Sequence, residues 1–187
     1  MTLLANLDTA VRQTLRYLTI ALFVLLGFLL LANVFVRLMG DLTQSLQQAG
    51  MSGLADMLRA MMPITSFHWL DEIVELCFSA LIFYGAAALW AEKGHFSVGD
   101  WISGHLPGEG YRSTYRMLIA VINLVFLLIF LGFSLRLTIQ ATELSTVFQI
   151  PKQVMYSSLP ISSMIMTAYS LAELVDCIGS FRKKPTG

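Results

Sequence analysis

The sequence predicts an all-α integral membrane protein with four transmembrane helices, both termini in the cytoplasm and a possible short interfacial helix in an outer loop. Three observations predict this class. Of the 187 residues, 56% are hydrophobic and only 13% are charged, whereas a soluble domain has about a quarter charged residues. The mean hydropathy is +0.70. Long uncharged segments recur along the chain, which favours a polytopic membrane protein.

Three of the uncharged segments have the length of a membrane span, which needs about 20 largely apolar residues. They hold twenty residues at 17–36, nineteen at 117–135 and twenty at 153–172. A shorter segment at 76–91 is bracketed by Trp69 and Trp90, as interfacial aromatic residues bracket a span. We therefore predict a single membrane domain over 1–187, with spans at about 15–37, 69–91, 114–137 and 152–178.

Basic residues beside the spans predict the orientation. Eight of the twelve lie near the chain ends and in the 89–116 segment: Arg12, Arg16, Lys93, Arg112, Arg116, Arg182, Lys183 and Lys184. The other four, on the opposite side, are Arg37, Arg59, Arg136 and Lys152. Because positive flanks favour the cytoplasm, both termini are expected inside.

The formal net charge of zero gives no indication of nucleic-acid binding.

The outer loop at 38–68 is long for a simple turn and contains the stretch "SGLADMLRAMMP". Ser52 is a candidate N-cap and Pro63 a stop. The apolar side chains that would share one helix face are Leu54, Met57, Leu58 and Met61. We expect a short helix that lies in the outer interface against lipid, although a Met-rich face also suits a partner protein.

The acidic residues that open the second span are candidate site residues, because charge near hydrocarbon is costly and usually functional. Asp71, Glu72 and Glu75 share the predicted outer side with Arg37 and Arg136, which close the first and third spans. Glu72 and Glu75, three residues apart, lie on one helix face. Two interpretations stay open: an ion-pair belt at the interface, or a contact surface for a partner protein.

The stretch "LWAEKGHFSVGDWISGHLP" at 89–107 gathers acidic, basic and imidazole side chains between two spans. His95, Asp100 and His105 are spaced five residues apart, which is not the close spacing of a zinc site. We interpret Glu92, Gly94, His95 and Asp100 as a cytoplasmic loop motif that fixes the turn after the second span. No catalytic, metal-binding or cofactor-binding residue is predicted.

The fourth span combines Pro160 with several hydroxyl side chains at helical spacing. Proline removes one backbone hydrogen bond and crowds the preceding turn, so a kink is expected at Pro160. Small hydroxyl side chains let helices approach closely. This pattern indicates helix packing, either within the chain or against a second subunit.

Four motifs together resemble one family. "NVFVR" closes the first span, "WLDEIVEL" opens the second, "GAAALWAEKGHFSVGDWISGHLP" leads out of it, and "IPKQVMYSSLPIS" starts the fourth. In order, spacing and span count the chain resembles the small membrane subunit of tripartite ATP-independent periplasmic (TRAP) transporters, the DctQ-like family.

This resemblance implies a non-enzymatic subunit without cofactors in the bacterial inner membrane, surrounded by membrane lipids. Its implied partners are a large DctM-like membrane subunit, which moves substrate with a sodium gradient, and a periplasmic substrate-binding protein. The substrate is typically an organic acid. The small subunit is implied to be a scaffold that widens the fixed part of an elevator-type machine.

Two other functions compete with this one. A free-standing small transporter or channel should show a buried mid-membrane charge or repeat symmetry, and the sequence shows neither. A membrane oxidoreductase subunit would need reactive cysteine pairs in loops, whereas Cys77 and Cys177 lie in apolar segments.

Overall fold

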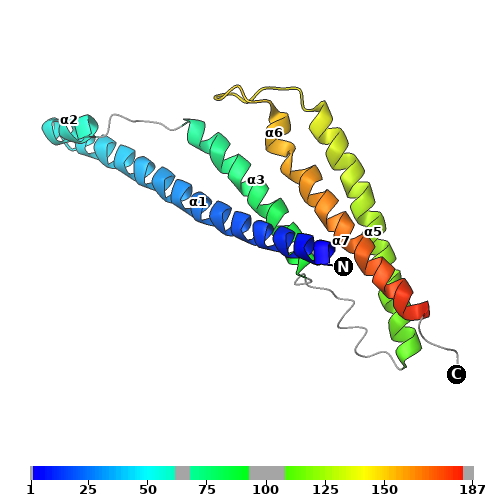
Figure 1. Ribbon diagram of the computed structural model, residues 1–187. Coiled ribbons are helices and arrows are strands. Elements are labelled where there is room, and N and C mark those ends of the chain that lie inside the picture. Colours follow the sequence, from blue (N-terminus) through cyan, green and yellow to red (C-terminus); the bar gives the residue numbers. More distant parts are fainter. Residues whose placement is uncertain (1, 62–67, 93–107, 183–187) are drawn as a thin grey trace.

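The computed structural model describes residues 2–61, 68–92 and 108–182, and Figure 1 shows the chain as a set of helices. In chain order they are α1 (Thr2–Gln48), α2 (Ser52–Met61), α3 (His68–Ala91), α5 (Glu109–Gln140), α6 (Lys152–Tyr156) and α7 (Ser158–Arg182). Within these described ranges, four segments are long and apolar enough to cross a membrane: α1, α3, α5, and α6 together with α7. The predicted all-α class with four helical segments of membrane-spanning length is confirmed, and the cytoplasmic location of both termini stays a prediction.

Helix α1 is longer than a membrane span requires. Its 47 residues measure about 70 Å at 1.5 Å per residue, against about 30 Å for the hydrocarbon core. No proline interrupts the helix before its last residue, Gln48, and the chain turns away from it at Gly50, whose φ is +79°. There the Gly50 amide donates to the Gln47 carbonyl at 3.1 Å and the Met51 amide to the Leu46 carbonyl at 3.0 Å. These two bonds form a Schellman motif.

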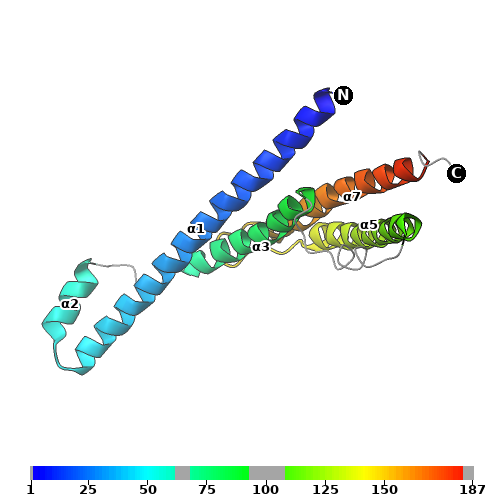
Figure 2. The same cartoon turned by 90° about the horizontal axis from the view of Figure 1, so that it is seen from below.

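Helix α2 folds back on the end of α1, so the segment 38–61, expected as loop with one short helix, is almost entirely helical (Figure 2). Ala55 is fully buried in this contact, and the Arg59 guanidinium donates to the Gln47 side-chain oxygen at 3.0 Å. Leu54 and Met57 stay exposed. The predicted short helix is present, and its contact with the membrane interface stays a prediction.

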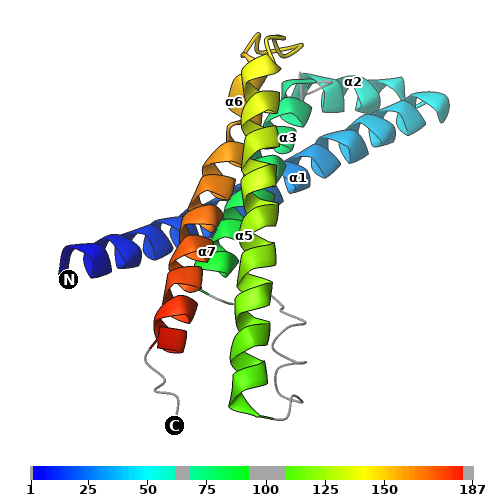
Figure 3. The same ribbon diagram turned by 90° about the vertical axis from the view of Figure 1, so that its right-hand side faces the viewer.

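The four long segments pack in a row. Helix α1 packs along α3, α3 along α7, and α7 along α5, whereas within the described ranges the backbones of α1 and α5 do not pack on each other. Figures 1 and 3 show α1 at one side of this row, inclined steeply to α5. The row is therefore open, unlike a four-helix bundle in which the last helix returns to the first.

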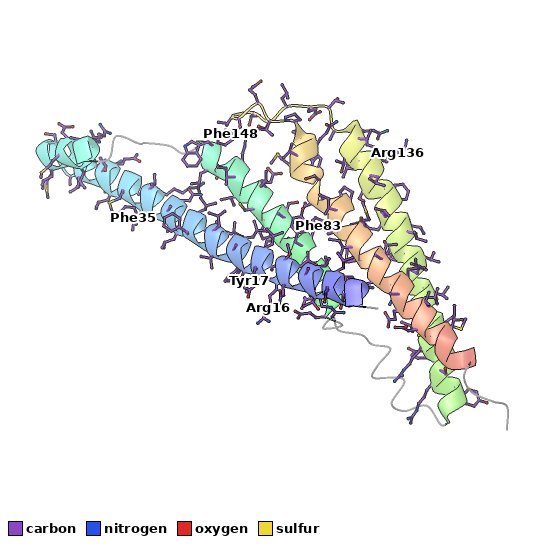
Figure 4. The ribbon with its side chains drawn as sticks, viewed as in Figure 1. Arg16, Tyr17, Phe35, Phe83, Arg136 and Phe148 are labelled. Atoms are coloured by element: carbon purple, nitrogen blue, oxygen red, sulfur yellow. The ribbon has the colours of Figure 1, made fainter. Side chains whose placement is uncertain are left out.

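Two small apolar clusters hold the row together. Leu26 and Leu29 of α1 pack against Leu70 and Cys77 of α3. The second cluster joins all four segments and consists of Leu15, Ala87, Leu127 and Met166. Much of the remaining apolar surface is exposed, and Figure 4 shows Tyr17 and Phe35 pointing away from the other helices. In a membrane protein such surfaces face lipid or another subunit.

Side-chain hydroxyl groups join the helices across the row. The Ser79 and Ser158 hydroxyls lie 3.2 Å apart, those of Ser134 and Ser163 lie 3.3 Å apart, and the Trp90 indole donates to the Ser170 hydroxyl at 2.9 Å. Such small polar contacts permit close helix approach in lipid. The hydroxyl pattern of the fourth span therefore serves helix packing within the chain.

Pro160 lies three residues beyond the boundary between α6 and α7, where Figures 1 and 3 show the two helices offset. Proline lacks the amide hydrogen that would reach the carbonyl four residues earlier, which is that of Tyr156. The Thr138 hydroxyl of α5 lies 3.3 Å from this carbonyl and 2.9 Å from the Ser134 carbonyl of its own helix, so its single proton is shared between the two acceptors. A side chain of the neighbouring helix thus replaces the missing backbone donor in part.

Candidate partner-binding site

The α5–α6 connection forms a short hairpin at the end of the row away from both chain termini (Figure 1). Its base is closed by an antiparallel bridge between Leu144 and Pro151. The Ser145 amide donates to the Ile150 carbonyl at 2.8 Å, and the Lys152 amide to the Glu143 carbonyl at 2.9 Å. We call residues 143–152 the outer hairpin, after the predicted orientation.

Glu72 of α3 binds this hairpin through both carboxylate oxygens. One oxygen accepts from the Thr146 hydroxyl and the Val147 amide, each at 2.7 Å; the other accepts from the Ser145 hydroxyl at 2.9 Å and the Phe148 amide at 3.2 Å. Four donors on one carboxylate form a charge-assisted network. Trp69, one turn earlier on α3, meets Phe148 edge to face at 6.4 Å. Glu72 and Trp69 therefore fix the hairpin on the end of α3.

A second contact closes the base of the outer hairpin. The Lys152 ammonium forms an ion pair with the Glu143 carboxylate. Hydrogen bonding and the charge of Lys152 hold the pKa of the Glu143 carboxyl below its ordinary value. Both side chains reach water, so this pair contributes little to the stability of the protein. Its main effect is to join the two ends of the outer hairpin.

The other predicted members of the acidic and basic group take different positions. Asp71 and Glu75 are exposed on α3. Arg37 is exposed on α1, about three turns before that helix ends, and Arg136 is exposed in the last turns of α5; Figure 4 shows Arg136 on the far helix of the row. Among the described residues, neither arginine forms an ion pair with Asp71, Glu72 or Glu75. The structure brings Glu72 to the hairpin and leaves the other four apart. Their contact with a partner stays a prediction.

Sequence reasoning did not find the role of Glu72 as a hairpin ligand. The segment 137–151 shows no periodic pattern, and Glu72 lies more than seventy residues earlier in the chain than its partners. The local signal was the Ser145–Thr146 pair ahead of Pro151, since hydroxyl side chains favour turns. That signal indicates a turn but does not identify the carboxylate that the turn binds.

A second polar cluster, also missed, joins α1 to α7 at the other end of the row. The Tyr169 hydroxyl donates to the Asp8 carboxylate at 2.7 Å, and the Arg12 guanidinium donates to the same carboxylate at 2.9 Å. Arg12 also lies over the Tyr169 ring at 5.4 Å. The spacing of Asp8 and Arg12, four residues apart, is a detectable helical ion-pair signal, whereas Tyr169 is far away in the sequence.

The predicted loop motif after the second span is only partly described. Glu92 is exposed just beyond α3, and its amide donates to the Ala88 carbonyl at 3.0 Å. Gly94, His95 and Asp100 lie outside the described residues. In the described ranges, no three histidine, cysteine or acidic side chains come together as a metal site would require.

Comparison with known families gives one match. Residues 50–179 match the model of the DctQ component of tripartite ATP-independent periplasmic transporters, a region that runs from just before α2 almost to the end of α7. No curated protein matches the chain. The family match covers well over half of the sequence and agrees with four membrane-crossing segments. The chain therefore belongs to the DctQ family and is the small membrane component of a tripartite ATP-independent periplasmic transporter.

Proposed function

We propose that this small subunit is a rigid scaffold for the large DctM-like subunit of a sodium-driven transporter that takes up organic acids. It acts in the bacterial inner membrane with both termini in the cytoplasm. The observation that supports this role best is the open row of helices: α1, α3, α7 and α5 hold together through limited contacts and leave extensive apolar surface exposed.

The polar groups inside the row support a scaffold rather than a transport path. Ser134, Ser162, Ser163 and Ser170 are buried, and each has a hydrogen-bond partner in the chain. These bonds join neighbouring helices or cap turns, as in helix packing. A moving transport domain needs a fixed body to move against, and additional helices in the bilayer enlarge that body.

Sodium coupling and substrate binding are assigned to partners of the chain. We propose that the large membrane subunit holds the sodium-linked path and that a periplasmic binding protein delivers the organic acid. The tripartite composition that the family description states supports a division of labour among separate components. The small subunit then contributes position and rigidity, and it needs no cofactor.

The test is co-expression with the large subunit. The two chains should purify as a stable one-to-one complex, and vesicles that contain the complex, a sodium gradient and the loaded binding protein should accumulate the organic acid. Vesicles with this chain alone should accumulate none. Substrate uptake by the small chain alone would show that it is a free-standing transporter and would refute the scaffold role.

A further inference from the structure

Asn123 places a carboxamide deep in the third crossing segment, α5. It lies seven residues after Arg116 and thirteen before Arg136, which is about 10 Å and about 20 Å along the helix axis at 1.5 Å per residue. Within the uncharged segment 117–135, the only other hydroxyl or amide side chain is that of Ser134. Because the hydrocarbon core is about 30 Å thick, the short Asn123 side chain does not reach the lipid headgroups from this depth.

The Asn123 carboxamide has no hydrogen-bond partner among the residues that the structure describes. Ser134, on the same helix, differs: its hydroxyl donates to the Leu131 carbonyl at 2.9 Å and lies 3.3 Å from the Ser163 hydroxyl. Asn33 of α1 also lacks a partner in the described ranges, but it lies four residues before Arg37, near the end of its uncharged segment. A carboxamide has two donors and one acceptor, and leaving them unpaired in hydrocarbon is costly.

Asn123 lies at the edge of the face with which α5 packs along α7. Ala120, three residues before it, and Leu127, four residues after it, are buried, and Leu127 shares an apolar cluster with Met166 of α7. Asn123 itself is partly buried, whereas Phe126, one turn further along, is 63% exposed. The helix contact therefore holds the amide in place and leaves it accessible to a group from outside the chain.

The depth of the amide indicates the kind of partner. Lipid tails offer no hydrogen-bonding group, and a soluble protein does not enter the hydrocarbon core. A second membrane helix supplies the missing bond if it carries a polar side chain or a free carbonyl at this depth, and asparagine is one of the side chains that join helices in lipid. A transport subunit has such groups along its path and at its broken helices, which favours the large subunit over a second copy of this chain.

We propose that Asn123 forms a hydrogen bond with a helix of the large subunit, and that the side of α5 that carries Asn123 and Phe126 is part of the contact between the two membrane subunits. This inference rests on the proposed function, which supplies the large subunit, and adds a position for the contact in the middle of the membrane. The amide then stabilises the association of the two chains without adding to the stability of the small subunit alone.

The experiment measures the association of labelled small and large subunits by energy transfer in vesicles of increasing lipid content. Asn123→Leu should weaken association about fivefold, as expected for one interhelical hydrogen bond in lipid, and Asn123→Gln, which keeps an amide, should weaken it less. The matched control moves the amide to the opposite face at a similar depth. Val125 is 50% exposed and lies about 200° around the helix from Asn123, so Val125→Asn should not restore association to the Asn123→Leu variant.

The unfolding temperature of the small subunit alone separates this role from a structural one. Asn123→Leu should not lower it, because the amide has no partner in the described part of the chain; a marked fall would reveal a bond within the chain and overturn the inference.

Two further results would overturn it and leave the scaffold role intact. One is unchanged association of Asn123→Leu with the large subunit, and the other is energy transfer between two small subunits that Asn123→Leu abolishes. Failure of the wild-type small and large chains to associate would refute the scaffold role, and this inference with it.

Discussion

At the scale of the residue, helix position decides what each carboxylate of the acidic group does. Glu72 points toward the α5–α6 connection and accepts four hydrogen bonds from it, whereas Asp71 and Glu75 are exposed. A rotation of 100° per residue separates Asp71 from Glu72 on the helix. Three similar side chains in one short motif therefore divide into one structural ligand and two charges that remain accessible.

The Glu143–Lys152 pair predicts a pH dependence at the base of the outer hairpin. Because folding lowers the pKa of Glu143, its contribution to stability is complete above the unfolded value of about 4.3 and is lost as the pH falls through the lower folded value. Wild type and Glu143→Gln should therefore differ slightly in unfolding temperature at pH 6, and the difference should vanish in strong acid. A difference that grew on acidification would contradict this ion pair.

At the scale of the element, the fourth crossing segment shows how a proline is accommodated in lipid. Pro160 leaves the Tyr156 carbonyl without its backbone donor, and the Thr138 hydroxyl of the adjacent helix, which is shared with the Ser134 carbonyl, supplies one in part. An unsatisfied carbonyl in hydrocarbon costs several kcal/mol. The bond from the neighbouring helix therefore lowers the cost of the proline at this helix boundary. The boundary between α6 and α7 also orients α6 toward the outer hairpin.

This arrangement predicts coupling between Thr138 and Pro160. Thr138→Val should destabilise the subunit by about 1 kcal/mol, in the range of interhelical hydrogen bonds in membranes. In the Pro160→Ala background the backbone amide at position 160 can donate to the Tyr156 carbonyl, so the same change should cost much less. Denaturant titration in detergent of the two single variants and the double variant gives the coupling. Strictly additive effects would show that the hydroxyl does not replace the backbone donor.

At the scale of the whole molecule, the sequence predicts the crossing segments well and their arrangement poorly. The apolar runs at 17–36 and 117–135 are detectable because lipid excludes charge. The row order of α1, α3, α7 and α5 is not detectable, because side chains that face lipid are as apolar as those that face another helix. The Glu72 site was missed for a related reason: its four donors are two backbone amides and two hydroxyl groups that only the fold brings close.

The proposed function includes an orientation of the whole molecule, with both termini in the cytoplasm. This orientation predicts opposite accessibility at the two ends of the row. In a chain with Cys77→Ala and Cys177→Ala, a cysteine at Leu144 in the outer hairpin should react with a membrane-impermeant maleimide on intact spheroplasts. A cysteine at Tyr111, which is also well exposed but lies at the start of α5, should react only after lysis. Tyr111 is 71% exposed and Leu144 51% exposed, so weaker labelling at position 111 on intact spheroplasts would report the side of the membrane and not burial. The reverse pattern would place the termini outside and move the hairpin to the cytoplasm, and it would contradict the predicted orientation.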